Sequence, residues 1–144
     1  MVRTLDARSS QNGNGNVYYE ALPTDPTIFG QVGLNIVNPG GIIRVQLVGS
    51  FVVSPISTLT GRTFIYVKLV RGYNYDDPRV YLSSWAIQIE DSFTNKNLSF
   101  SCCDYVTSAP PNNQLVYTLF VNSTISSFVR KGPENLNAIA FCDE

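Results

Sequence analysis

The segment Gln114–Ser123, with the sequence QLVYTLFVNS, constrains the fold more than any other stretch of the chain. In an extended conformation, alternate residues lie on opposite faces, so Leu115, Tyr117 and Leu119 share one face. Phe120 gives the other face an apolar character as well. A strand that is apolar on both faces is usually covered on both faces. The segment therefore predicts a buried strand, and we consider a second subunit as its outer cover.

From Val17 onward, runs of β-branched and aromatic residues alternate with clusters of Gly, Pro and Asn, which is typical of an all-β protein. No segment has a convincing 3.6-residue apolar period, and Ser123–Arg130 fits either a loop or a short turn of helix. Strands at this spacing predict a two-sheet sandwich. The eight predicted strands are Val17–Leu22, Gln31–Val37, Ile42–Ser54, Thr63–Arg71, Val80–Glu90, Leu98–Cys103, Gln114–Ser123 and Leu136–Cys142.

The third of these runs shows the clearest alternation. Ile43, Val45 and Leu47 point one way and Arg44 points the other, which predicts a half-buried strand. The runs that begin at Thr63, Gln114 and Leu136 are apolar on both faces instead. These runs indicate that one sheet is covered again from outside.

The first sixteen residues differ from the rest in composition. Ser9–Asn16, SSQNGNGN, has the polar and glycine-rich composition of a flexible linker. Before it, Val2 and Leu5 are the only sizeable apolar residues after Met1. We expect residues 1–16 to form an arm and linker and residues 17–144 to form one head domain, with a frayed terminus as the alternative to a working arm.

The sequence carries no catalytic signature. Histidine is absent, which removes the commonest general base and the commonest metal ligand. The formal net charge of −1 does not favour nucleic acid as a partner. No apolar run approaches the roughly 20 residues of a membrane-spanning helix, and the N-terminus lacks the apolar region of a secretory signal. We therefore expect no enzymatic activity, no cofactor and no membrane span.

Two kinds of residue remain as candidates for ligand binding. The carboxylate pairs Asp76-Asp77 and Glu90-Asp91 lack a loop of alternating oxygen ligands, so we interpret them as turn and strand-end residues and expect no metal. Aromatic side chains are able to stack on sugars, and ordinary packing is the alternative for each of them. These aromatic candidates are Tyr18, Tyr19, Tyr73, Tyr75 and Trp85.

Three stretches of the chain together resemble a known family. Thr63–Gly72, TFIYVKLVRG, is a middle strand that ends in Arg-Gly. Phe100–Leu119 runs from a Ser/Cys/Asp strand end through Pro-Pro-Asn-Asn into Tyr-Thr-Leu, and Leu136–Ala140, LNAIA, is a short apolar strand near the terminus. This order resembles the tumour necrosis factor-like jelly roll shared with complement's globular heads, and is most similar to bacterial and phage versions. The resemblance covers about Val17 to Phe141.

The resemblance implies an antiparallel jelly roll of eight or ten strands that assembles as a tight homotrimer, with the inner sheet packed about the threefold axis. Together with the two-sided apolar pattern, it places four residues in the trimer core: Tyr117, Leu119, Ile139 and Phe141. Family members on bacterial spores form surface filaments or their tips, and phage members bind receptors from tail fibres. This chain departs from the family because no Gly-X-Y collagen repeat precedes the head.

Three cysteines, Cys102, Cys103 and Cys142, leave one thiol unpaired within the chain or paired between chains. Adjacent strand residues point to opposite faces, so the first two do not form a metal motif. The family pairs the last strand inside the same sandwich, which implies a bond from Cys142 to one of the other two, within or between subunits. Buried, reduced thiols are the alternative.

These features favour a structural subunit of an extracellular filament or spore-surface appendage. In this hypothesis the partner is the chain itself, first as a homotrimer and then as a head-to-tail polymer, with a surface anchor or tip protein at its end. Val2, Arg3 and Leu5 act as the fibre connector that docks on the next trimer. The alternative is a receptor- or carbohydrate-binding head of a spore or phage fibre.

Overall fold

The alternating residues from Ile43 onward form the longest strand of the fold, β4 (Ile43–Pro55), which buries Val45 and Leu47 as expected. The computed structural model describes residues 1–12, 20–56, 62–87, 95–126 and 128–143. The other strands are β1 (Val2–Asn12), β2 (Glu20–Ala21), β3 (Thr27–Asn35), β5 (Thr63–Arg71), β6 (Arg79–Ile87), β7 (Lys96–Val106), β8 (Gln114–Ser123), β9 (Phe128–Arg130) and β10 (Glu134–Asp143). A 3₁₀ turn, η1 (Pro111–Asn113), precedes β8.

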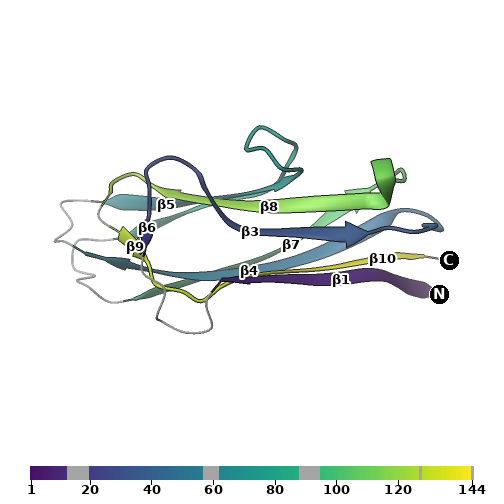
Figure 1. The fold of residues 1–144 in the computed structure, drawn as a ribbon, viewed down its shortest axis with the longest axis horizontal. Helices are drawn as coiled ribbons and strands as arrows, with labels where there is room; N and C mark the ends of the chain where they lie inside the picture. The colour runs from purple at the N-terminus through teal and green to yellow at the C-terminus, as the bar shows by residue number, and fades with distance from the viewer. Residues whose placement is uncertain (13–19, 57–61, 88–94, 127, 144) are drawn as a thin grey trace.

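The strands form two antiparallel sheets that face each other along the long axis of the molecule (Figure 1). The larger sheet has the order β1-β10-β4-β9-β2, and β7 pairs with the free side of β4. The smaller sheet has the order β3-β8-β5-β6. This arrangement confirms the predicted all-β, two-sheet antiparallel jelly-roll sandwich.

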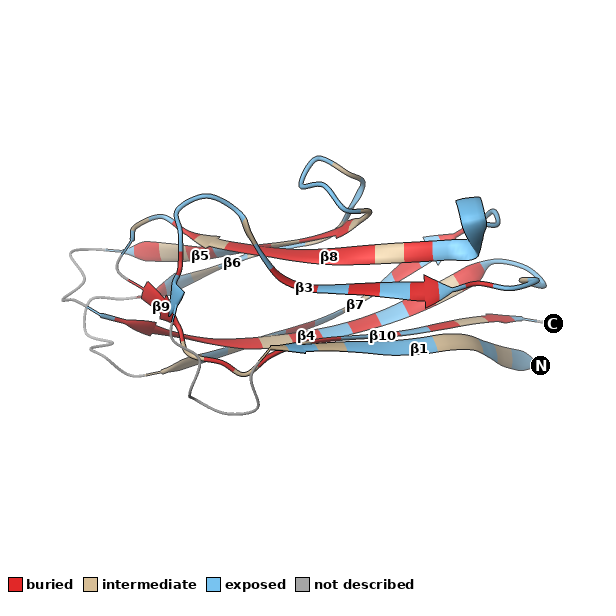
Figure 2. Ribbon diagram, viewed as in Figure 1, coloured by how far each residue is buried: buried red, intermediate tan, exposed pale blue. Residues whose placement is uncertain are grey.

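The core lies between the two sheets, and buried and exposed residues alternate along the strands that enclose it (Figure 2). Aromatic rings fill its middle. The ring of Phe51 meets Phe29 edge to face at 5.3 Å between centroids and meets Trp85 at 6.3 Å. Such edge-to-face pairs stabilise a core beyond the area that they bury. Each sheet therefore covers the apolar inner face of the other.

Two strands were not expected from the sequence. The predicted arm over residues 1–16 is not separate from the head, because Val2–Asn12 forms β1 at the edge of the larger sheet, paired with β10. The backbone hydrogen bonds of this pairing need no apolar side chains, and the composition therefore does not reveal them.

Phe128–Arg130 is β9 and not a loop or helical turn, because it pairs with β4 and β2. Of the predicted strand Val17–Leu22, only Glu20–Ala21 is a described strand.

The two apolar faces of β8 are both covered within one chain. Tyr117 and Leu119 are 0% and 1% exposed and point into the core between the sheets. On the other face, Phe120 is covered by Tyr75, whose ring meets it edge to face at 5.4 Å. The head's own core therefore encloses Tyr117 and Leu119 without a second subunit, and their place near a trimer axis stays a prediction.

Candidate functional site

The outward side of the larger sheet carries an apolar surface that the chain itself leaves uncovered. We call the surface formed by Val48, Cys103, Tyr105, Ile139 and Phe141 the apolar outer face. Strand register places these residues on the neighbouring strands β10, β4 and β7. Tyr105 is 61% exposed, and Ile139 and Val48 are each 45% exposed. The predicted trimer-core residues Ile139 and Phe141 therefore lie where a second subunit can reach them.

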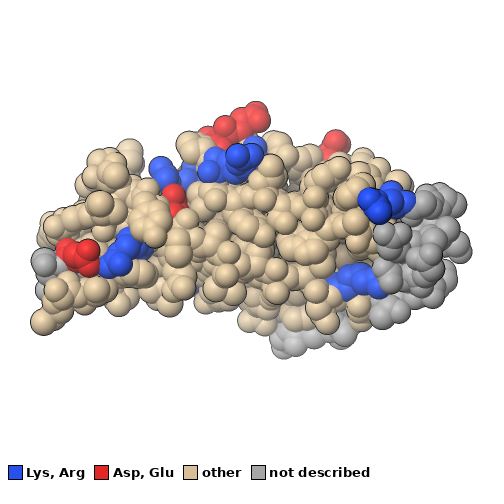
Figure 3. Space-filling model, turned by 180° about the vertical axis from the view of Figure 1, so that it is seen from behind, with Lys and Arg blue, Asp and Glu red and all other residues tan. Residues whose placement is uncertain are grey.

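Charge on this face is small and paired. Arg44 donates a hydrogen bond to Asp143 at 2.7 Å, and its guanidinium lies 4.7 Å from the centroid of the Phe141 ring. The cation therefore lies against an aromatic ring and a carboxylate at once. Figure 3, which shows the sandwich edge-on from behind and not the apolar outer face itself, likewise shows a surface that is mostly uncharged. A contact made through the apolar outer face thus leaves no unpaired Arg44 charge.

The three cysteines do not form the predicted bridge. Cys102 faces Leu47 and Cys142 faces Ile43, but β7 and β10 lie on opposite sides of β4. Two strand spacings of about 4.8 Å and an offset of four residues keep the two Cα atoms roughly 15 Å apart, well beyond the ~7 Å limit of a disulfide. Cys103 is displaced in the same way, and all three thiols are free. The strand register therefore excludes the bond of Cys142 within one chain, and the bond between subunits stays a prediction.

The environments of the three thiols differ. Cys142 is fully buried, and its sulfur accepts a hydrogen bond from the backbone N–H of Gly40 at 3.4 Å. Burial raises the pKa of Cys102 to about 11, and the neighbouring Cys103 and Asp104 add to this increase. Cys103 is exposed on the apolar outer face. The raised pKa of Cys102 keeps it in the unreactive thiol form, burial shields Cys142 from reagents, and Cys103 is accessible.

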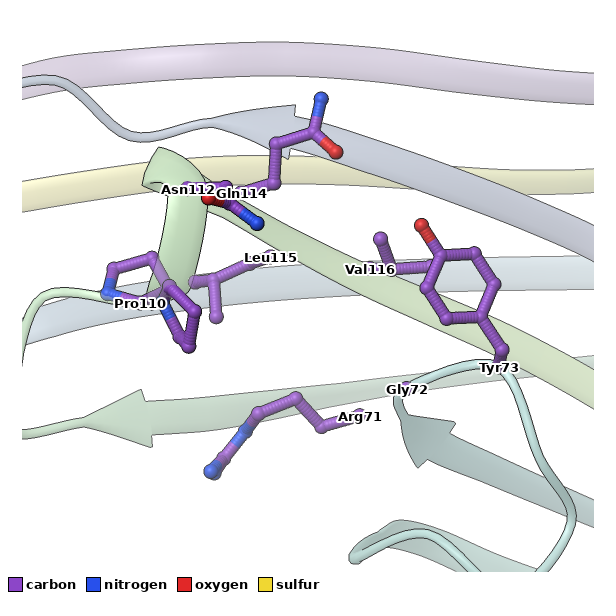
Figure 4. A pocket seen from close by; sticks show the side chains of 9 residues that line it. Arg71, Gly72, Tyr73, Pro110, Asn112, Gln114, Leu115 and Val116 are labelled. Carbon is purple, nitrogen blue, oxygen red and sulfur yellow. The ribbon is translucent and has the colours of Figure 1, made fainter.

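A second feature is a pocket of about 380 Å³ where β5 ends and β8 begins. Its residues come from three places in the sequence and converge on one opening (Figure 4). Arg71 is the last residue of β5, and Gly72 and Tyr73 follow it. The other residues belong to η1, the residue before it and the start of β8. These other lining residues are Pro110, Pro111, Asn112, Gln114, Leu115 and Val116.

A charged network holds the wall of this pocket. The Nε and Nη2 atoms of Arg71 each donate to the Asp104 carboxylate at 2.7 Å, and the Tyr117 hydroxyl donates to it at 2.8 Å. The hydrogen bonds from Arg71 raise the pKa of its guanidinium, and burial raises the pKa of Tyr117. Asp104 belongs to the larger sheet and its partners to the smaller one. The network therefore ties the two sheets together beside the pocket.

The sequence singled out several residues near this site. Tyr73 lines the pocket and is 59% exposed, as a sugar-stacking residue requires. Tyr75 instead packs on Phe120, and Trp85 contacts Phe51 in the core. Tyr18 and Tyr19 lie outside the described residues. Arg71 and Asp104 were not predicted as site residues, although the Arg-Gly strand end contains the first of them.

Of the carboxylates considered as metal ligands, Asp77 has a structural role in a loop. Asp77 accepts a hydrogen bond from the backbone N–H of Asn74 at 2.8 Å and so closes the loop after β5. Glu90 and Asp91 lie outside the part of the chain that the structure describes. Within that part, no group of three His, Cys, Asp or Glu residues is arranged to hold a metal ion.

Comparisons with known proteins identify the fold and nothing finer. No protein-family model matches the sequence, and no curated protein matches it. The chain is similar to dimeric latent PorU from Porphyromonas gingivalis, with 14% identity and a TM-score of 0.53, over 96% of this chain but only 13% of that one. It is also similar to the Eiger TNF of S. frugiperda, with 8% identity and a TM-score of 0.50, over 95% of this chain and 92% of that one. The described residues include no helix long and apolar enough to cross a membrane.

Proposed function

We propose that this chain is a structural subunit that assembles through its apolar outer face into a homotrimer. The carrying observation is that Val48, Tyr105 and Ile139 are each at least 45% exposed and lie on adjacent strands. Exposed apolar patches of this kind mark sites of protein association. Tyr105, the most exposed of them, is the type of aromatic residue that anchors interfaces. A jelly roll offers this sheet as a flat surface for two further copies.

The proposal extends to a filament outside the cell, such as a spore-surface appendage. Charged residues make up 15% of the chain, well below the usual quarter, which suits a protein whose surface is largely covered by copies of itself. A polymer also needs an end, and a surface anchor or tip protein would provide it. In this proposal the trimers are joined head to tail by the connector residues Val2, Arg3 and Leu5.

The connector is the edge strand β1. It pairs with β10 on one side only, and Leu5 is its partly buried apolar residue that packs against the core. Polar side chains add further anchors. The Asp6 carboxylate accepts the backbone N–H of Asn35 at 2.7 Å, and the Asn12 amide donates to the carbonyl of Phe29 at 3.0 Å. The β10 edge of another head offers β1 the same backbone hydrogen bonds, so exchange between heads loses few contacts.

Replacing Ile139 with Asp should convert the trimer into a folded monomer. The substitution places a carboxylate on the apolar outer face, where burial by another subunit would remove its water. The head should still fold because the Ile139 side chain is 45% exposed and leaves the core unchanged. Light scattering measures the mass of each form. Leu82→Asp, an equally exposed position on the smaller sheet, is the matched control and should remain a trimer. A monomeric unmutated protein would refute the proposal.

Thiol alkylation should report on the same face. In the assembled protein we expect Cys103 to be slow to react because another subunit covers it, and in the Ile139→Asp monomer we expect it to react quickly. Cys102 and Cys142 should stay slow in both, given their burial and the raised pKa of Cys102. Intact-mass measurement counts the modified thiols with time. Equal rates at Cys103 in the two samples would place the interface elsewhere.

The alternative function, a receptor- or carbohydrate-binding head, rests on a separate observation. The pocket beside Tyr73 lies at the strand ends and not on the apolar outer face. Assembly and ligand binding therefore use different parts of the head, and neither proposal depends on the other.

A further inference from the structure

We infer that the pocket between Tyr73 and Gln114 is a binding site for a neutral sugar. Its volume of about 380 Å³ lies within the range of small-ligand sites. This inference stands apart from the proposed assembly. It deepens the alternative function, a carbohydrate-binding head, and follows from the shape of the pocket, its charge and the kinds of groups that line it.

The shape is fixed by backbone conformations that only certain residues accept. Gly72 has φ of +142°, and a Cβ added there would lie 2.1 Å from the Asp77 carboxylate. Asn112 and Asn113 on the opposite rim have φ of 55° and 57°, in the left-handed region. Such conformations cost free energy and concentrate at ligand sites. Their occurrence on both sides of one opening indicates a site whose shape is set before a ligand arrives.

Hydrogen bonds hold both rims in place. Gly72 donates its N–H to the carbonyl of Val116 at 2.8 Å and accepts from the Thr118 hydroxyl at 2.7 Å. On the other rim, the carbonyl of Asn113 accepts the N–H of Ile36 at 2.7 Å. Neither rim therefore needs to be ordered when a ligand binds, which reduces the entropic cost of binding.

The charge of the pocket argues against an anionic ligand. Arg71 is the only charged residue among those that line it, and two of its N–H groups are bonded to the Asp104 carboxylate. That pairing offsets the positive charge and fixes the plane of the guanidinium. The guanidinium has five N–H donors in all, so it retains donors for an uncharged oxygen such as a hydroxyl.

The remaining lining groups match a sugar. Tyr73 offers an exposed ring, and the half-buried Val116 adds an apolar surface for the C–H face of a pyranose, whereas Leu115 lines the pocket from the core side of β8. Asn112 and Gln114 are exposed amides that both donate and accept hydrogen bonds, as hydroxyl groups require. In Figure 4, the Tyr73 ring and the two amide side chains come from opposite sides of the pocket. A molecule with one apolar face and a rim of hydroxyls fits between them.

The test is a titration of the full-length protein with four neutral probes, the methyl glycosides of glucose, galactose, mannose and N-acetylglucosamine, followed by calorimetry or NMR. At least one should bind in the millimolar range. Tyr73→Ala should weaken that binding by about tenfold, the scale of one aromatic contact. The matched control is Tyr66→Ala, which removes an exposed ring from the outer side of β5 in the same sheet and should leave the affinity unchanged.

Three results would each overturn the inference. The first is that none of the four glycosides binds. The second is binding that Tyr73→Ala leaves unchanged, or that Tyr66→Ala weakens equally, because the sugar would then occupy another site. The third is tighter binding of methyl glucuronide than of methyl glucoside, since a preferred anion would contradict the neutrality assigned to the Arg71–Asp104 pair. Light scattering of each variant separates these outcomes from a failure of the proposed trimer.

Discussion

Replacing Asp104 with Ala should destabilise the head by about 2–4 kcal/mol, somewhat less than the roughly 3–5 kcal/mol for breaking a fully buried ion pair. The substitution leaves Arg71 without its carboxylate and the Tyr117 hydroxyl without an acceptor, the latter in a residue with no exposed surface. The Arg71 side chain is 35% exposed, and water reduces the penalty accordingly. Urea unfolding in the monomeric Ile139→Asp background measures the change without a contribution from assembly.

Two further variants show whether the buried network carries this effect. Tyr117→Phe removes one hydrogen bond and should cost only about 1 kcal/mol. Asp143→Ala breaks an ion pair with Arg44 whose carboxylate side chain is 71% exposed, and it should change stability by less than about 1 kcal/mol. If Asp104→Ala costs no more than Asp143→Ala, the network does not tie the two sheets together energetically.

The network also shows where sequence reasoning ends. Arg71 and Asp104 lie 33 positions apart and belong to different sheets. Neither residue lies in a pattern that indicates its partner, because the pairing exists only after the sheets have packed. In contrast, the buried face of β4 follows from local alternation of Val45 and Leu47 with polar residues, and this face was predicted correctly.

Strands β8 and β1 were predictable only in part, unlike the buried face of β4, which was predicted, and the Arg71–Asp104 pair, which was not. The sequence correctly predicted that both faces of β8 are covered, but it could not show that Tyr75 of the same chain covers Phe120. For β1, the composition indicated an arm because Leu5 is its main apolar contact. Its pairing with β10 comes from backbone groups that every sequence possesses. The candidate pocket was anticipated only through Tyr73, since its other walls come from distant segments.

Oxidation of a cysteine pair placed across β1 and β10 should link chains covalently in the filament. Ser9 and Asn137 are exposed and face each other in register. Facing residues of an antiparallel pair have Cα atoms roughly 4.5–5.5 Å apart, within the range of a disulfide. In the Ser9→Cys, Asn137→Cys variant, with Cys103→Ser to remove the exposed thiol, exchange of β1 between heads gives a ladder of linked chains on a non-reducing gel. Docking of β1 on its own head gives a single-chain band.

The matched control moves one cysteine to the other side of β10. Asn137 also faces Val48 of β4, and these two strands belong to the same folded head in either arrangement. Asn137→Cys with Val48→Cys, again with Cys103→Ser, should therefore give only a single-chain band. We expect the ladder from the first pair because the β10 edge of the next head offers β1 the same backbone pairing that it leaves, and because the three arms of one trimer act together in binding the next. Single-chain bands from both pairs in polymerised protein would show that β1 is not the connector, while leaving the trimer and the sugar site to their own tests.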